Sequence, residues 1–418
     1  MLTIAFLSWG DLFEDFHDTI GVTLETFCDE LAGGWRFNYI EALKLVGIRT
    51  VLFFVSARVS ETLRYTHAAT GAMVCVLPQP RIHRAVRYYS TRIALFPALK
   101  VALASYLATP LGLLARELRR EGCDAILCQE YEYARFDVCV LLGQLMRLPV
   151  FATFQGGSRH YSRLEDALRP LAIRACAGLM IAPQTESQRV SACYGVPPAK
   201  IARIFNPMDV ETWRASDRAE ARAAIGIPLD ARVVVCHGRI EIDIKGLDVL
   251  LDAWERICCD RPGKELKLLL VGTGSNANEL RQRIATMQLR DVLWVDEYVR
   301  DRTAMQRYLS AADVYTLPSR YEGFPVAPIE AMACSLPVVC ADAAGVPDIL
   351  EGGEASGGLV VPRGDALALA LALGRVLDDE AWGRELGKRA RCRAQECFSL
   401  ETIGKQMRDF LLSQKATS

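Results

Sequence analysis

The sequence predicts an α/β protein built from two doubly wound domains. Short apolar runs typical of buried parallel strands alternate with amphipathic helical patterns along the chain. The alternation occurs in two series, which the non-periodic stretch 206–209 separates. Ligands of such sheets bind beyond the carboxyl ends of the strands, so we expect two domains that face each other across a cleft holding the site.

The first series of strands predicts an N-terminal domain over residues 1–205. Its strand-like runs are Thr3–Leu7, Thr50–Val55, Ala125–Cys128, Pro149–Thr153 and Gly178–Ala182, and its helical patterns include Asn38–Val46 and Leu111–Arg120. Residues 93–114 are mostly apolar as well. Prolines, a lysine and a glycine interrupt them, which favours two packed helices over a membrane span.

The second series predicts a C-terminal domain over residues 206–395. Its strand-like runs are Val233–Cys236, Leu266–Val271, Leu293–Val295, Val314–Leu317 and Pro337–Cys340. A last helix is predicted at about 396–414, because apolar residues recur at helical spacing within Phe398–Leu412.

Composition excludes several classes of protein. The 418 residues are 51% hydrophobic with a net charge of −1, which excludes a disordered chain and a nucleic-acid footprint over the whole surface. The 14 cysteines include no Cys-x2-Cys pair, so we expect no zinc site and a reducing compartment. The first residues resemble a buried strand rather than a signal peptide, and the predicted location is cytoplasmic.

Residues 319–337 carry the densest functional pattern. Glu322 and Glu330 flank the beginning of a short helix, and Gly323, Phe324 and Pro325 form a tight turn between them. Pro325 and Pro328 are compatible only with a first helical turn, where amide hydrogens have no partners. Such amides bind anions or sugar hydroxyls, so the two carboxylates are expected to serve different parts of one ligand.

A basic pair follows the first strand of the second domain. Arg239 comes directly after the strand and His237-Gly238, and Lys245-Gly246 precedes a helix with a buried apolar stripe. Two fixed positive charges at a strand end suit a diphosphate. No Asp-x-Asp and no Ser-His-Asp arrangement stands out, so we expect these cations to replace a metal. His237 is expected to pack rather than to bind.

Gly272 and Gly274 form a Gly-x-Gly-x-x-Ala match with Ala277 after the next strand. Asp296 follows about twenty residues later, as in a dinucleotide fingerprint. This match supports an alternative function, an NAD(P)-dependent oxidoreductase. That alternative leaves Glu322, Glu330, Arg239 and Lys245 unexplained.

Taken together, these segments resemble the retaining glycosyltransferases of family 4, also called glycosyl transferases group 1, which have the GT-B fold. The resemblance implies that Glu330 holds the ribose hydroxyls of a nucleotide sugar and that Glu322 contacts the transferred sugar. It also implies that the last helix crosses back onto the first domain. The residues that the resemblance assigns to the donor are Gly33, Gly34, Gly238, Arg239, Lys245, Gly272, Gly274, Tyr298, Val299, Glu322, Gly323, Phe324, Pro325, Val326 and Glu330.

The same resemblance implies the reaction. A hexose-type sugar would move from a nucleoside diphosphate, such as UDP, to an acceptor with retention at the anomeric carbon, in polysaccharide, glycolipid or other glycoconjugate synthesis. Arg239, Lys245 and Glu322 would act in catalysis, with no metal and no cofactor beyond the donor. Many family members have a histidine where this chain has Gln155, which with Gly156 and His160 is a candidate sugar or acceptor contact.

Two further points stay open in the sequence. Gln155 keeps a non-catalytic nucleotide-sugar-binding protein as a third alternative. Residues 62–116 contain no acidic residue. Either they form a solvated basic face, or they meet an anionic, lipid-linked acceptor or the inner face of a membrane. The basic residues of this stretch are Arg64, Arg81, Arg84, Arg87, Arg92, Lys100 and Arg116.

Overall fold

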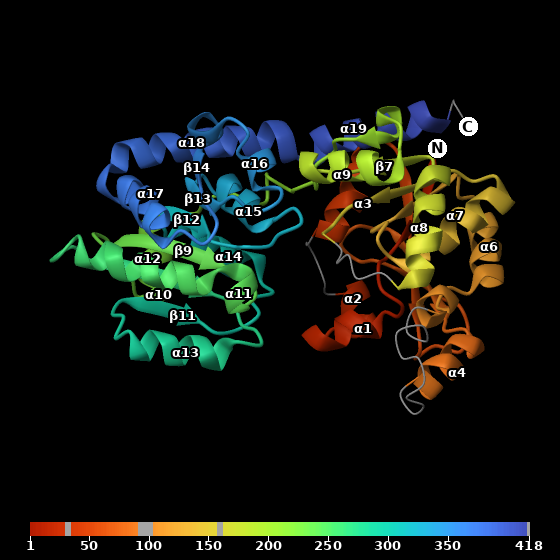
Figure 1. Ribbon diagram of the computed structural model, residues 1–418, viewed down its shortest axis with the longest axis horizontal. Helices are drawn as coiled ribbons and strands as arrows, with labels where there is room; N and C mark the ends of the chain where they lie inside the picture. The colour runs from red at the N-terminus through yellow and green to blue at the C-terminus, as the bar shows by residue number, and fades with distance from the viewer. Residues whose placement is uncertain (30–34, 91–102, 157–161, 416–418) are drawn as a thin grey trace. The chain divides into compact units, whose positions relative to one another are not determined.

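The computed structural model describes residues 1–29, 35–90, 103–156 and 162–415 (Figure 1). The chain divides into two compact units: Met1–Pro207 together with Ile403–Ser418, and Met208–Thr402. Each unit is an α/β body with its own sheet and core. The prediction of two doubly wound α/β domains is confirmed.

Within the described residues, the first unit has an eight-stranded sheet in the order β3-β4-β2-β1-β5-β6-β7-β8. All neighbouring strands are parallel except β3, which pairs antiparallel with β4 at the edge. The strands are β1 (Thr3–Leu7), β2 (Arg49–Ser56), β3 (Leu63–Thr66), β4 (Met73–Pro78), β5 (Ala125–Cys128), β6 (Val150–Thr153), β7 (Gly178–Met180) and β8 (Ile201–Ala202).

Side chains alternate between the two faces of this sheet, as the pleat requires. Ala5 and Leu7 point into one apolar cluster, which helices α6 to α9 cover, whereas Ile4 and Phe6 point into another, which α1 to α3 and α19 cover. The helices of this unit are α1 (Glu14–His17), α2 (Leu24–Asp29), α3 (Trp35–Leu45), α4 (Arg81–Ser90), α6 (Leu111–Arg120), α7 (Ala134–Met146), α8 (Arg163–Ala175), α9 (Gln184–Tyr194) and α19 (Leu400–Lys415).

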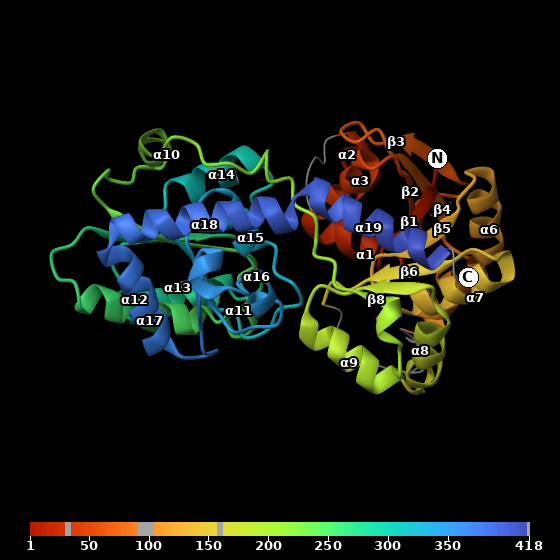
Figure 2. The ribbon, with the colours of Figure 1, turned by 90° about the horizontal axis from the view of Figure 1, so that it is seen from above.

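The last helix, α19, belongs to the core of the first unit. Ile403, Met407 and Leu411 are buried there, and α19 lies beside α3 in both views (Figures 1 and 2). Gly404 permits this approach, because a Cβ atom at Gly404 would lie 2.3 Å from the carbonyl oxygen of Ala42. The predicted return of the C-terminal helix to the first domain is therefore confirmed.

Within the described residues, the second unit has a six-stranded, wholly parallel sheet in the order β11-β10-β9-β12-β13-β14. Its strands are β9 (Arg232–His237), β10 (Leu266–Val271), β11 (Val292–Val295), β12 (Val314–Leu317), β13 (Val338–Ala341) and β14 (Gly358–Val361). Its helices are α10 (Arg218–Ile225), α11 (Ile242–Lys245), α12 (Leu247–Cys259), α13 (Ala277–Thr286), α14 (Arg302–Ser310), α15 (Ala327–Ala333), α16 (Val346–Ile349), α17 (Ala366–Asp378) and α18 (Glu380–Phe398).

The strands β3, β4, β8 and β14 were not predicted from the sequence. β3 was not predicted because Leu63–Thr66 contains no run of apolar residues; three of its residues are half-buried and Thr66 is exposed. β4 and β14 are apolar runs that the prediction left out. The segment expected to be helical around 93–114 is described only from residue 103, and α6 begins at Leu111, as predicted.

Helix α18 anchors the loop that opens the second unit. The guanidinium Nη1 of Arg391 donates to the carbonyl oxygens of Val210, Trp213 and Ala333, the last at the end of α15. All three acceptor residues are buried. One side chain on α18 therefore holds both the first loop of this unit and α15, which carries Glu330.

We expect Arg391→Ala to lower the free energy of unfolding of the second unit by about 1–3 kcal/mol, because buried carbonyl oxygens lose their donor. Urea denaturation followed by tryptophan fluorescence measures this, since Trp213, Trp254, Trp294 and Trp382 all lie in this unit. Arg389→Ala is the control. Its side chain is 43% exposed and, among the described residues, pairs only with Glu385 on the same helix, so its change should stay below about 0.5 kcal/mol. Equal shifts for both variants would contradict the anchoring role.

Candidate functional site

The carboxyl ends of β9, β10 and β12 meet at one edge of the second sheet. A small pocket lies at this edge, lined by His237, Arg239, Lys245, Pro318 and Ser319 among others. β9 ends at His237, and the turn after β12 contains Pro318 and Ser319. The sheet topology therefore brings together residues that are about eighty positions apart in sequence.

Backbone turns approach each other so closely at this edge that side chains are excluded. A Cβ atom at Gly246, where φ is +61°, would lie 2.1 Å from the carbonyl oxygen of Pro318. A Cβ atom at Gly272 would lie 2.0 Å from the carbonyl oxygen of Gly238. These glycines are needed because only glycine lets the turns pack against each other.

The Gly-x-Gly turn has a structural explanation that does not involve a dinucleotide. The amide of Ile240 donates to the carbonyl oxygen of Thr273, and a Cβ atom at Gly274 would lie 2.4 Å from the oxygen of Ile240. Asp296, the acid that would bind a ribose in the oxidoreductase alternative, pairs with Arg281. Close packing against the turn after β9 thus accounts for the glycines.

Lys245 and Glu322 form an ion pair at the centre of the site. The ammonium Nζ of Lys245 lies 2.7 Å from Oε1 of Glu322, and the two side chains are 20% and 10% exposed. Lys245 is the last residue of α11, and Glu322 lies in the loop that leads to α15. The cation predicted for a diphosphate and the carboxylate predicted for a sugar are therefore in direct contact.

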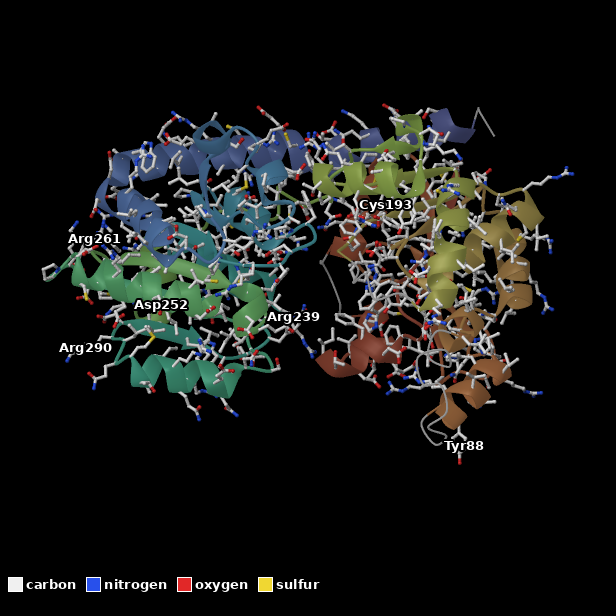
Figure 3. All side chains as sticks on the ribbon, viewed as in Figure 1. Tyr88, Cys193, Arg239, Asp252, Arg261 and Arg290 are labelled. Atoms are coloured by element: carbon white, nitrogen blue, oxygen red, sulfur yellow. The ribbon has the colours of Figure 1, made fainter. Side chains whose placement is uncertain are left out.

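Arg239 behaves differently from Lys245. Its side chain is 70% exposed and pairs with Glu241 at 3.1 Å. Figure 3 shows it extending away from the ribbon. The residues between the two cations are not a plain loop, because Ile242–Lys245 forms the single turn of α11. Of the basic pair, Lys245 is therefore held by Glu322, whereas Arg239 is largely exposed to solvent.

Glu330 has a partner that the sequence analysis missed. Nε2 of His237 donates to Oε2 of Glu330 over 2.8 Å. The expectation that His237 packs is confirmed, because it is only 8% exposed and its ring contacts that of Tyr315, but the end of β9 also brings the ring to Glu330 of α15. The signal was present in the sequence: His237 is a polar residue at the carboxyl end of a buried strand.

Burial changes the titration of the groups beneath the site. It raises the pKa of the Cys236 thiol to about 12 and that of the Tyr315 hydroxyl well above its ordinary value. Burial likewise raises the pKa of Cys340. These groups stay protonated at neutral pH, so they add no charge to the site.

The turn between the two glutamates is held from below. Phe324 is buried, and a Cβ atom at Gly345, after β13, would lie 2.9 Å from the carbonyl oxygen of Gly323. Val326, which precedes α15, provides no side-chain cap, so the first amides of that helix are not used by a cap.

Tyr298 is 57% exposed after β11, next to the half-buried Val299.

In the first unit, Gln155 is fixed by a network at the end of β6. Its Nε2 donates toward the Tyr39 hydroxyl, Thr153 Oγ1 and Asn206 Oδ1 at 3.1–3.3 Å. Its amide donates to Oε2 of the buried Glu130, which sequence analysis also missed. Gly156 follows, exposed and with φ at +93°. The side-chain donor of Gln155 is thus used internally.

Some predicted residues lie outside the described part of the chain. They are Gly33, Gly34, His160, Arg92 and Lys100. Their predicted roles stay predictions.

Two cations of the acid-free stretch 62–116 pair with acidic side chains. Arg64 pairs with Glu117, and Arg87 lies 2.8 Å from Asp15. Both acids come from outside the stretch. The exposed cations among its described residues are Arg81, Arg84, Arg87 and Arg116, and Tyr88 extends from the end of α4 (Figure 3). The anionic acceptor and the membrane contact stay predictions.

The described residues contain neither a metal-binding cluster nor a helix able to span a membrane. No cluster of His, Cys, Asp or Glu there is arranged to hold a metal ion. No described helix combines the length and the apolar character that crossing a membrane requires.

Residues 231–379 match the family described as glycosyl transferases group 1. Two curated relatives are D-inositol 3-phosphate glycosyltransferases, from Kineococcus radiotolerans (32% identical, over 53% of this chain and 54% of the relative) and Saccharomonospora viridis (33% identical, over 47% of each). The chain spans about half the length of the curated relatives that it matches. The predicted resemblance to this family is confirmed for the second unit.

Solved structures extend the likeness to the whole fold. A sucrose-phosphate synthase from Thermosynechococcus elongatus has a TM-score of 0.70 at 22% identity, covering 100% of both chains. HepE from Anabaena, solved in complex with UDP, has a TM-score of 0.72 at 18% identity, covering 99% of this chain and 100% of that one. At these identities the likeness establishes the GT-B fold class.

We expect Gly272→Ala to destabilise the second unit by more than about 2 kcal/mol, because the new methyl group would collide with Gly238 as well as strain the backbone. Gly263→Ala is the matched control: φ is also positive there, at +83°, but a Cβ atom would meet nothing within 4 Å. Urea denaturation of both ligand-free variants measures the difference. Equal losses would show that the close approach of the two turns contributes nothing.

Proposed function

We propose that this chain, whose second unit contains a glycosyl transferases group 1 domain, transfers a hexose-type sugar from a nucleoside diphosphate sugar to an acceptor with retention at the anomeric carbon. The observation that carries the proposal is the pairing of two carboxylates with two bases at one sheet edge. Lys245 holds Glu322, and His237 holds Glu330. Each carboxylate is thereby fixed before any ligand arrives.

The roles follow from position and charge. Glu330, whose side chain is 21% exposed, accepts hydrogen bonds from the ribose hydroxyls. Lys245 has three N–H groups, so it can keep Glu322 and still donate to a phosphate oxygen. The exposed Arg239 is free to swing toward the diphosphate. The first amides of α15 and the turn at Gly323–Val326 receive the sugar.

The chemistry needs charge neutralisation more than a nucleophile. As the bond to the sugar breaks, negative charge grows on the leaving diphosphate, and preorganised cations stabilise that charge most in a poorly solvated site. Glu322 is engaged by Lys245, so it serves to position the sugar. The acceptor hydroxyl gives its proton to the leaving phosphate on the same face of the sugar.

The first unit provides the acceptor side in this proposal. Gln155 and Gly156 lie at the end of β6, with Glu130 beneath them. The exposed φ-positive Gly156 leaves room for a sugar hydroxyl near the backbone. Gly33, Gly34 and His160 keep the roles that the sequence predicted for them.

A binding and turnover experiment tests the function. Thermal shift with UDP, ADP, GDP, NAD and NADP identifies the nucleotide, and nucleoside diphosphate release from the matching sugar donors measures turnover. D-inositol 3-phosphate is the first acceptor to try, because the curated relatives bear its name. NMR of the product reports the anomeric configuration. Nucleotide binding without turnover on any donor would leave a binding protein, and stabilisation by NAD alone would favour the oxidoreductase.

Glu330→Ala should weaken binding of the nucleoside diphosphate by at least about tenfold while leaving the fold intact. A carboxylate that accepts from ribose hydroxyls makes bonds worth about 1.5–3 kcal/mol each. Isothermal titration calorimetry measures the change. The control is Glu354→Ala, a carboxylate of the same unit that is 42% exposed and whose one ion pair within the described part of the chain is with Arg375. Unchanged affinity in Glu330→Ala would remove the ribose assignment.

Lys245→Ala should lower kcat by about a hundredfold to a thousandfold and weaken donor binding much less, because the cation is needed most when charge develops. Arg239→Ala should act in the same direction with a smaller effect, since its side chain is solvated. Arg256→Ala, which removes a 54% exposed cation paired with Asp260, is the control. Steady-state kinetics with and without EDTA complete the test. A strict requirement for a divalent ion would contradict the proposed role of the two cations.

A further inference from the structure

His237 is placed to act on Glu330 and on no other described group. It is the last residue of β9 and only 8% exposed. Its Nε2 donates to Oε2 of Glu330 at 2.8 Å, whereas its Nδ1 is buried and makes no hydrogen bond to any described residue. A carboxylate oxygen can only accept, so Nε2 carries the proton. Among the described residues, the imidazole ring therefore makes one hydrogen bond, the one to Glu330.

Packing fixes the ring that makes this bond. The ring of His237 meets that of Tyr315 at 5.3 Å between centroids and 64° between planes. Tyr315 lies in the middle of β12, is fully buried, and its hydroxyl makes no hydrogen bond to the described residues. β9 and β12 are neighbouring parallel strands, so the buried Tyr315 ring packs against the His237 ring and restricts its movement.

Glu330 itself lies on a different element, the short helix α15. Its Oε2 is held by His237, and Oε1 makes no hydrogen bond that involves a described residue. A free glutamate side chain loses rotamer freedom when it binds a ligand. A glutamate held by a buried ring has lost that freedom already, so both oxygens keep a fixed plane.

We propose that His237 is a positioning residue that fixes the plane of the Glu330 carboxylate, so that its two oxygens meet the two hydroxyls of a ribose at once. The site would therefore select ribonucleotide donors over 2′-deoxyribonucleotide donors. This inference rests on the proposed function, because it concerns the same nucleotide. Two adjacent hydroxyls need two oxygens in one plane, and a carboxylate free to rotate satisfies only one of them well.

The test compares UDP with 2′-deoxy-UDP by isothermal titration calorimetry, or the corresponding ADP or GDP pair if that base binds better. The wild-type protein should prefer the ribonucleotide by on the order of tenfold to a hundredfold, the worth of one bond to a charged group. His237→Phe should reduce this preference to about threefold or less. His237→Gln, whose Nε2 can replace the ring Nε2, should retain most of it.

Two controls separate positioning from a general effect on the fold. Tyr315→Phe keeps the ring that packs against His237 and removes only a hydroxyl that has no partner among the described residues. The preference for the ribonucleotide should therefore not change. In a Glu330→Gln background, His237→Phe should have no further effect on the preference, because the two residues act as one unit. If His237→Phe does not fold, His237→Asn replaces it in the test, because the asparagine side chain is too short to reach Glu330. This variant should also lose most of the ribonucleotide preference.

The outcomes are distinguishable. Equal binding of both nucleotides by the wild-type protein would overturn this inference and leave the proposed transfer reaction standing. An undiminished ribonucleotide preference in the folded His237→Phe or His237→Asn variant would overturn it as well. Absence of any nucleotide binding by the wild-type protein would overturn the proposed function, and this inference with it.

Discussion

The close packing of backbone turns at the carboxyl ends of β9, β10 and β12 is the constraint on which the candidate site depends. Gly246 touches Pro318, and Gly272 touches Gly238, with no room for a Cβ atom at either position. This packing sets where α11 ends and therefore where the Lys245 side chain begins. The ion pair with Glu322 follows from it, because the segments that carry the two side chains are joined by the hydrogen bond from the Arg320 amide to the Ile244 carbonyl oxygen.

The site is preorganised by pairing each acid with a base. An unpaired carboxylate in a poorly solvated site would carry a large desolvation cost, and a neighbouring donor offsets it. Glu322 and Glu330 each have such a donor, a lysine and a histidine on the β9 side of the sheet. In the proposed reaction an entering diphosphate meets Lys245 already held in place, so little reorganisation is needed as charge develops.

The two units differ in how they hold polar groups. In the second unit Glu322 and Glu330 are paired with Lys245 and His237, and these four side chains are 7–21% exposed. In the first unit the Gln155 network is neutral apart from Glu130, and its donors are used internally. Burial raises the pKa of the Tyr39 hydroxyl in this network, so it remains a hydrogen-bond donor to Asn206. This network is suited to shaping a surface, whereas the second unit is suited to binding charge.

The sequence by itself determined the two α/β units, most of their parallel strands, the last helix and the segment that carries Glu322 and Glu330, whereas the return of that helix to the first unit was implied by the resemblance to the family. Apolar runs, helical spacing and glycine–proline turns are local signals, so they can be read without coordinates. Only the tertiary structure decided which polar groups meet. The Lys245–Glu322 contact and the His237–Glu330 bond join residues 77 and 93 positions apart. Arg64 and Arg87 likewise pair with acids from outside the acid-free stretch, and the sequence did not predict these pairs. Such side-chain contacts depend on the order of strands in the sheet, and no local sequence pattern contains that order.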